Sequence, residues 1–76
     1  MSERLPALKP KDVIRALEKL EFYIHHTTGS HFVLKHTTNP RLRVVVPWHS
    51  TDLKRGTLRG IIDSAGLTVD EFVSVL

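Results

Sequence analysis

The spacing of apolar residues predicts a helix at the start of the chain. Between residues 8 and 22, apolar side chains recur every three or four positions, with charged residues between them. The inward positions would be Val13, Ile14, Leu17 and Leu20. Pro10 fits the first turn of this helix, where its missing N–H removes no hydrogen bond.

From residue 22 to residue 36 the pattern alternates with a period of two, which predicts a β-hairpin. One face would carry Phe22, Ile24, Phe32 and Leu34. If Ile24 pairs with Leu34, Thr27 lies opposite His31, and residues 28–30 form a three-residue loop. Such a loop needs one residue at positive φ, which Gly29 adopts without steric cost.

Residues 42–49 predict a third strand, which Pro47 ends or confines to an edge because proline cannot donate to a ladder. Its core side would carry Leu42, Val44, Val46 and Trp48. A second helix follows and ends at Gly66; its inward residues would be Leu58, Ile61, Ile62 and Ala65. Thr68 and Glu71 then form a capping box before a short apolar helix.

These elements predict a single α+β domain over residues 1–76. Their order is α-β-β-β-α-α, with a three-stranded antiparallel sheet and the helices on one of its faces. The other face would stay open. By the register above, it displays a set of mostly polar residues: Tyr23, His25, His31, Lys35, Arg43 and His49. Such a face is either a functional surface or the ordinary polar side of a sheet.

Composition excludes some kinds of chemistry. The 76 residues include five histidines but no cysteine, so there is no disulfide and no thiolate nucleophile or ligand. The N-terminus has no apolar run typical of a signal peptide, and no segment approaches the length of a membrane helix. We therefore expect a cytoplasmic protein without membrane attachment. The net charge of +3 weakly favours a polyanionic partner.

Neither a metal site nor a serine nucleophile fits the histidine-rich stretch. His25 and His26 are adjacent in a predicted strand and would point to opposite faces, so they would not chelate together. The spacings of known zinc sites are absent. Ser30 precedes His31, but no strand-turn-helix presents it as a nucleophile. We expect no metal and no other cofactor.

Cleavage of an RNA phosphodiester bond requires fewer protein groups than a metal site or a serine nucleophile does. RNA carries its own nucleophile, the 2′-hydroxyl, so an enzyme need only deprotonate it and stabilise the charge that develops on phosphorus. A histidine can be the base, and Arg or Lys can stabilise the charge. His31, beside the turn formed by Gly29 and Ser30, suits the base. The candidates for the general acid are His49, His25 and His31 itself, which would then return the proton.

The start of the second predicted helix is a candidate phosphate seat. A helix N-terminus presents free N–H groups and partial positive charge. The sequence "LKRGTLRG" places Lys54 and Arg55 in front of it, Thr57 in its first turn and Arg59 one turn on. Lys35 and Arg43 on the open sheet face are further candidates for phosphate contacts. A solvated basic helix start would look the same.

Three short motifs, in this order and at these distances, resemble the HicA (YcfA-like) toxins of HicA–HicB toxin–antitoxin systems. They are G-S-H at residues 29–31, P-x-H at residues 47–49 and L-x-x-G-T-L-R at residues 53–59. The resemblance extends over essentially the whole chain. It implies a fold like that of double-stranded-RNA-binding domains. It also implies an mRNA interferase that cleaves RNA without a metal through His31, and a HicB-type antitoxin that covers His31.

The chain departs from that family pattern at two positions. Many relatives have a second histidine after G-S-H, where this chain has Phe32, which the register places in the core. Relatives also usually end the first helix with Gly-Phe, where this chain has Glu21 and Phe22. The missing glycine predicts a local stability cost of about 1 kcal/mol.

Two readings compete with a toxin. One is a non-catalytic RNA-binding module on the same fold, although the second helix has fewer lysines than such modules usually carry. The other is a structural protein whose open sheet face docks a partner. Growth arrest on expression, relieved by a companion protein, would separate the toxin from both.

Overall fold

The computed structural model describes residues 5–76 and has the predicted α-β-β-β-α-α order. Helix α1 spans Pro10–Lys19, with Pro10 in its first turn as predicted. The backbone N–H of Lys9 donates to the Asp12 carboxylate at 3.2 Å, which satisfies one donor at the helix start. Val13, Ile14 and Leu17 are buried, while Leu20 is half-buried at the C-cap.

Glu21 takes the position that relatives usually give to glycine. Its φ is +73°, in the left-handed region, where a residue with a Cβ is strained. Its carbonyl accepts from the backbone N–H of Thr37 at 2.9 Å, which ties the helix end to the sheet. The chain therefore keeps the left-handed turn without the residue that makes it easy.

We expect Glu21→Gly to stabilise the protein by about 0.5–1 kcal/mol, because relief of the strain outweighs the extra freedom of glycine in the unfolded chain. The melting temperature should rise by roughly 2–8 °C for a domain of this size. Glu18→Gly, at an exposed position inside α1, is the matched control. It should lower the melting temperature instead. A fall with Glu21→Gly would contradict the account.

Three antiparallel strands form the sheet in the order β1-β2-β3: Phe22–Thr28, His31–His36 and Arg43–Pro47. Ile24 pairs with Leu34 as predicted. The pairing then shifts by one residue between Ile24 and His26, at a β-bulge. Thr28, and not Thr27, therefore lies opposite His31. The predicted three-residue loop is wrong: only Gly29, at φ +55°, and Ser30 connect the strands.

The bulge also changes which face His26 occupies. His26 now pairs with Val33 and lies on the same side of the sheet as His25. We call the side away from the helices the open face. Its residues are Tyr23, His25, His26, Thr28, His31, Val33, Lys35, Arg43, Val45 and Pro47. The expectation that His25 and His26 point to opposite faces is therefore wrong.

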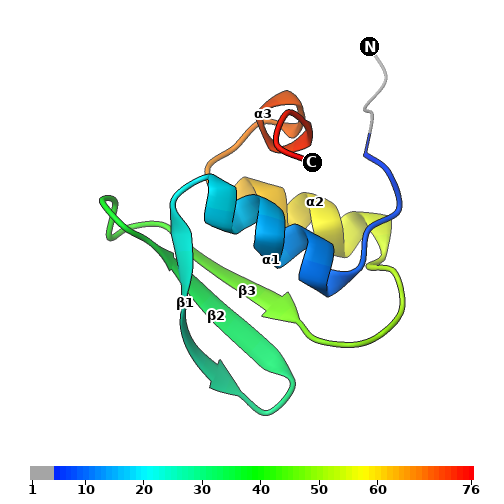
Figure 1. The fold of residues 1–76 in the computed structure, drawn as a ribbon, viewed down its shortest axis with the longest axis horizontal. Coiled ribbons are helices and arrows are strands. Elements are labelled where there is room, and N and C mark those ends of the chain that lie inside the picture. Colours follow the sequence, from blue (N-terminus) through cyan, green and yellow to red (C-terminus); the bar gives the residue numbers. More distant parts are fainter. Residues whose placement is uncertain (1–4) are drawn as a thin grey trace.

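Helix α2 spans Arg55–Ser64, and α3 spans Val69–Val73. Gly66, at φ +72°, follows the end of α2 as predicted. The predicted capping box of α3 is confirmed: the Glu71 N–H donates to Thr68 Oγ1, and the Thr68 N–H donates to the Glu71 carboxylate. Figure 1 shows α1 and α2 on one side of the sheet, with α3 beyond them.

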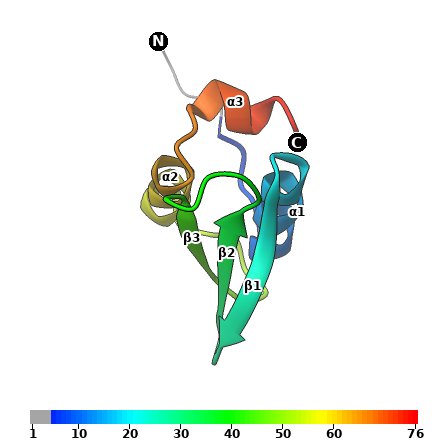
Figure 2. The same cartoon turned by 90° about the vertical axis from the view of Figure 1, so that its left-hand side faces the viewer.

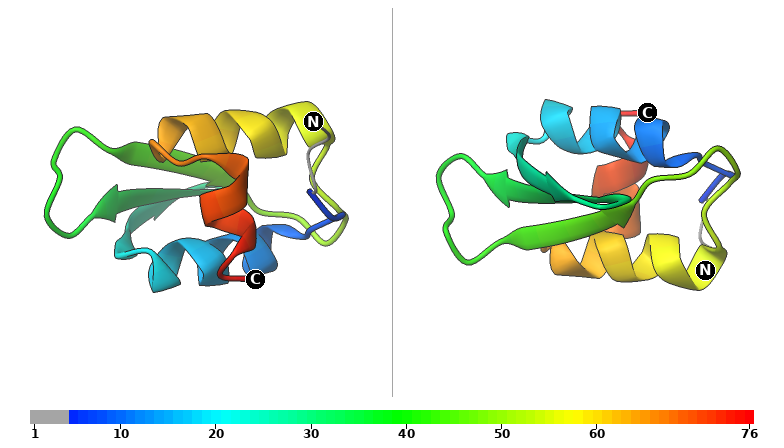
Figure 3. Two further views of the ribbon diagram at one scale, coloured as in Figure 1. Left: turned by 90° about the horizontal axis from the view of Figure 1, so that it is seen from above. Right: turned by 90° about the horizontal axis from the view of Figure 1, so that it is seen from below.

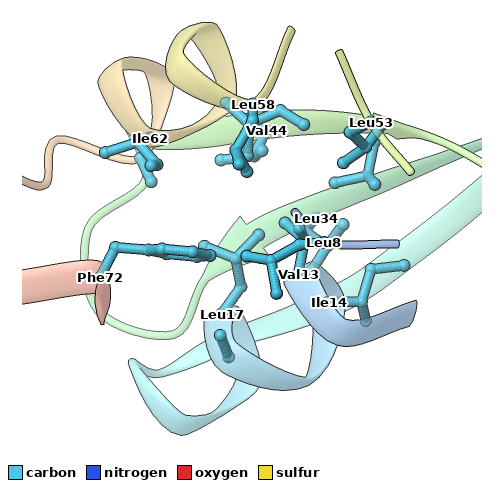
Figure 4. Packing of buried hydrophobic residues seen from close by; sticks show 14 of the residues in the cluster. Leu8, Val13, Ile14, Leu17, Leu34, Val44, Leu53, Leu58, Ile62 and Phe72 are labelled. Carbon is cyan, nitrogen blue, oxygen red and sulfur yellow. The ribbon is translucent and has the colours of Figure 1, made fainter. Parts of the chain in front are cut away.

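The core lies between the sheet and these helices. Figure 3 shows α3 crossing between α1 and α2, and the close view in Figure 4 shows Phe72 reaching from α3 into that gap. Phe72 is fully buried, as are Leu17 of α1 and Ile62 of α2. The third helix is therefore the closing layer of the core.

Three side chains depart from the predicted burial. Ile24 and Trp48 were placed on the core side, yet they are 39% and 43% exposed. Trp48 is hydrogen-bonded to the turn at the far end of the β1–β2 hairpin, which projects beyond the helices (Figure 2). Ile24 instead lies on the edge strand β1, opposite the buried Leu34. Phe32, which packs against Trp48, is half-buried. Val33, by contrast, is buried on the open face, where His26 and Val45 flank it in the neighbouring strands.

Candidate active site

His31 begins the central strand at the projecting end of the sheet. It pairs with Thr28 on one side and Pro47 on the other, so both neighbouring strands fix its backbone. Its side chain is exposed on the open face. Apart from its chain neighbours Thr28 and Ser30, no heavy atom lies within 4 Å of where a Cβ would stand on Gly29, so space is open next to the turn. A ligand backbone can approach His31 from this side.

The residues after β3 run past the same turn. The Trp48 N–H donates to the Ser30 carbonyl at 2.6 Å, which extends the β2–β3 pairing by one residue. His49 follows directly and is exposed, with its Nδ1 3.2 Å from Thr51 Oγ1. The structure therefore places His49 one residue beyond a backbone that is hydrogen-bonded to the G-S-H motif.

The starts of α1 and α2 lie at one end of the molecule (Figures 1 and 3). A hydrogen bond from the Leu53 N–H to the Leu8 carbonyl, 2.8 Å long, joins the segments that lead into them. Lys54 is the N-cap of α2, and no side chain caps it. The first turn of α2 contains no acidic residue. At the start of α2, positive side chains thus coincide with the positive end of a helix, an arrangement that favours an anionic ligand, whereas Asp12 occupies the first turn of α1.

The other candidate residues of α2 are also at its surface. Thr57 is exposed in the first turn. Arg59 lies one turn on, and its Nε is 3.9 Å from the Asp63 carboxylate. Within residues 5–76, no ion pair involves Lys54 or Arg55. Lys54 and Arg55 therefore have no ion-pair partner within residues 5–76, whereas the Arg59 guanidinium lies near the Asp63 carboxylate.

Lys35 and Arg43 lie on the open face but at its other end. They pair with each other across β2 and β3. Lys35 is four residues from His31 along β2, roughly 13 Å at the usual rise of a strand. The structure therefore separates these two cations from His31. They form a second basic area beside Tyr23 and His25.

The two histidines at the bulge form a close pair. Their Nδ1 atoms are 2.8 Å apart, and the rings meet edge to face. The positive charge of Lys35 lowers the pKa of His25, with smaller contributions from partial desolvation and from His26. Although two imidazoles now converge, residues 5–76 contain no group of three histidine or acidic side chains that could hold a metal.

Comparison with known protein families identifies the family to which this chain belongs. The family model for the HicA toxin of bacterial toxin–antitoxin systems matches residues 10–67, from the first residue of α1 to just beyond α2. The chain belongs to the HicA toxin family. HicA toxins are generally ribonucleases, and each works with an antitoxin partner. No curated protein matches the chain. Across residues 5–76 this HicA toxin has no helix long and apolar enough to cross a membrane.

Of the remaining histidines of this HicA toxin, His36 has a structural role and His26 has no assigned role. His36 pairs with the buried Phe22 and packs edge to face on its ring. Its Nδ1 accepts from the backbone N–H groups of Thr38 and Asn39, so it shapes the turn before β3. Sequence reasoning missed His26, because the bulge that turns it outward has no signature in the pattern. It also missed Trp48 as a surface residue.

The His25 pKa offers a test of the local electrostatics. Because Lys35 disfavours the protonated imidazole, Lys35→Met should raise the pKa of His25 towards its ordinary value. NMR titration of the His25 ring protons from about pH 5 to pH 8 would measure this shift. Lys54→Met is the matched control and should leave His25 unchanged. An unchanged His25 pKa in Lys35→Met would show that the assigned cause is wrong.

Proposed function

We propose that this HicA toxin is a ribosome-independent endoribonuclease in which His31 is the general base. One observation supports this most: His31 is exposed at the start of the central strand, beside an open two-residue turn, while both neighbouring strands hold its backbone. A base must be fixed in position and still reach its substrate. Membership of a family of ribonuclease toxins supplies the reaction class.

The reaction needs no group beyond the RNA and the protein. Neutral His31 takes the proton from a 2′-hydroxyl, and the oxygen attacks the adjacent phosphorus. The bond from phosphorus to the 5′-oxygen breaks, and an acid protonates that oxygen as it leaves. The products are a 2′,3′-cyclic phosphate and a 5′-hydroxyl. Proton transfer by a positioned histidine accelerates such a step by about 10²–10⁴-fold.

His49 suits the general acid better than His25. It follows the Trp48 backbone that is hydrogen-bonded to Ser30, so it belongs to the same end of the sheet as His31. His25 lies on the bulge of β1, and nearby Lys35 lowers its pKa. A lowered pKa disfavours the protonated imidazole, whereas a general acid must carry its proton.

The basic residues divide into two sets that would hold RNA at different points. Lys54 and Arg55 stand at the exposed start of α2, with Thr57 and Arg59 behind them. They would contact phosphates near the scissile bond. Lys35 and Arg43 would contact phosphates further along the open face. Gly29 and Ser30 would shape the turn that admits the RNA.

A HicB-type antitoxin would cover the open face and His31 with it. Besides its histidines and cations, this face exposes two apolar side chains, Tyr23 at 42% and Val45 at 36%. Mixed apolar and charged surface of this kind is typical of protein interfaces. Binding there would block the base sterically.

Purified protein and a short unstructured RNA, without ribosomes and with a metal chelator present, would test the proposal. We expect cleavage that an equimolar HicB-type antitoxin stops. Tight binding of RNA with no cleavage under any condition would instead identify a non-catalytic RNA-binding module. If the protein neither binds nor cleaves RNA, RNA is not its substrate.

A further inference from the structure

A groove beside the catalytic end takes part in the reaction described above only through His49. Its volume is about 430 Å³, within the range of small-ligand sites. We call it the Trp48 groove; its lining residues are Lys9, Lys11, Trp48, His49 and Ser50. It lies between the start of α1 and the segment that follows β3, and it shares His49 with the proposed active site.

Trp48 is unusually exposed for a tryptophan in a small domain. Its ring rests on Phe32, with the ring centroids 4.8 Å apart, yet 43% of the residue remains exposed. The backbone hydrogen bond to Ser30 fixes its main chain. An aromatic ring that is held in position and left open on one side is a ready platform for stacking.

Positive charge surrounds this ring. Lys9 and Lys11 are exposed, and no described residue forms an ion pair with either ammonium group. The hydrogen bond between Leu53 and Leu8 brings this segment against the one that carries Lys54 and Arg55. The groove therefore combines an aromatic surface with cations next to the proposed phosphate contacts.

We propose that the Trp48 groove binds one unpaired nucleobase of single-stranded RNA, stacked on Trp48, with Lys9 and Lys11 on its phosphates. This inference rests on the proposed function for the identity of the polymer. The proposal requires a single-stranded substrate, because a base within a duplex does not expose its flat face. Lysine is depleted in the cores of protein interfaces, so two lysines beside the ring favour nucleic acid over a protein partner.

The position of the groove fits an RNA that passes around the end of the sheet. Trp48 packs with Phe32 on the helix side, whereas His31 is on the open face. Both residues flank the same turn, since Pro47 pairs with His31 and Trp48 bonds to Ser30. A nucleotide stacked on Trp48 would therefore be close in the strand to the one whose 2′-hydroxyl His31 deprotonates.

The single tryptophan of the chain makes stacking directly measurable. The His31→Ala variant, checked for folding by circular dichroism, would be titrated with a short unstructured oligoribonucleotide while Trp48 fluorescence is followed. We expect saturable quenching by the single strand and at least tenfold weaker binding of the same sequence as a duplex. Equal binding of duplex and single strand, or binding without quenching, would overturn the proposal.

Substitutions distinguish the contribution of the Trp48 ring to RNA binding from that of the lysine charges. In the His31→Ala background, binding of a dye-labelled single strand should weaken about tenfold with Trp48→Ala and recover mostly with Trp48→Phe. Lys9→Ala combined with Lys11→Ala should reduce the salt slope of log Kd by roughly 1.4, the value for two phosphate contacts. Leu76→Ala, which truncates an apolar side chain of similar exposure after α3, away from both basic areas, is the control and should leave binding unchanged.

These measurements do not depend on cleavage, so failure of the proposed function would show itself differently. Quenching and ring-dependent binding with an inactive wild-type protein would overturn the nuclease but support the groove. Cleavage that is insensitive to Trp48→Ala would overturn the groove but support the nuclease. Loss of antitoxin binding in Trp48→Ala with RNA binding intact would assign the groove to the protein partner.

Discussion

His31→Ala should lower the rate of RNA cleavage by about 10²–10⁴-fold, because the 2′-hydroxyl then has no base to accept its proton. His31 is exposed, and its side chain forms no hydrogen bond with any residue from 5 to 76. The substitution should therefore leave folding and RNA affinity nearly unchanged. Single-turnover cleavage with protein in excess would measure the chemical step apart from binding.

His26→Ala is a matched control for this experiment. It removes an exposed histidine from the same face of the sheet, three residues before the turn. We expect cleavage within a few-fold of the wild type. A His31→Ala protein that cleaves at more than half the wild-type rate would show that another group is the base. His31→Gln, which keeps a polar side chain of similar size, should be as inactive as His31→Ala.

Phe72→Ala should destabilise the protein by about 3–5 kcal/mol, the usual cost of emptying a buried phenylalanine site. Phe72 is fully buried and fills the gap between α1 and α2. A chain of this length has a total stability of about 4–11 kcal/mol, so the loss would be at least a quarter of it. The effect is notable because Phe72 lies beyond residue 67, where the family match ends.

Urea or thermal unfolding followed by circular dichroism would measure this loss. Leu76→Ala is the matched control, since it truncates an apolar side chain that is 48% exposed near the same helix. Its effect should stay below about 1 kcal/mol. A Phe72→Ala protein as stable as Leu76→Ala would mean that α3 does not close the core.

Sequence periodicity predicted the order of the elements because each one buries a single apolar face. It failed within β1 for a physical reason. From His25 to Thr28 every residue is polar, so no apolar alternation specifies which side each residue faces. A one-residue bulge there costs no buried contact, and it brings His25 and His26 to one face. The predicted loop length was wrong as a result.

Periodicity also indicates a side of the sheet without showing how far the helices extend over it. Helices α1 and α2 have ten residues each, about 15 Å long, whereas the seven residues of β1 span about 23 Å. The sheet therefore continues beyond its cover. Trp48 lies at this uncovered end, whereas Ile24 is exposed on the edge strand β1 although it pairs with the buried Leu34.

The candidate site was only partly predictable. The short motifs led to His31, His49 and the start of α2. Their spatial relation depends on tertiary hydrogen bonds, from Trp48 to Ser30 and from Leu53 to Leu8, that no local pattern encodes. The same contacts place Lys9 and Lys11 beside Trp48, and no pattern in the sequence groups these three residues.

The central claim is that this HicA toxin cleaves RNA by activating the 2′-hydroxyl. The most direct measurement compares an RNA oligonucleotide with the same oligonucleotide carrying a single 2′-deoxy sugar at the cleaved position. We expect the all-ribose strand to yield a 2′,3′-cyclic phosphate and a 5′-hydroxyl, and the substituted strand to stay intact at that bond. Cleavage of both strands at equal rates would contradict the account.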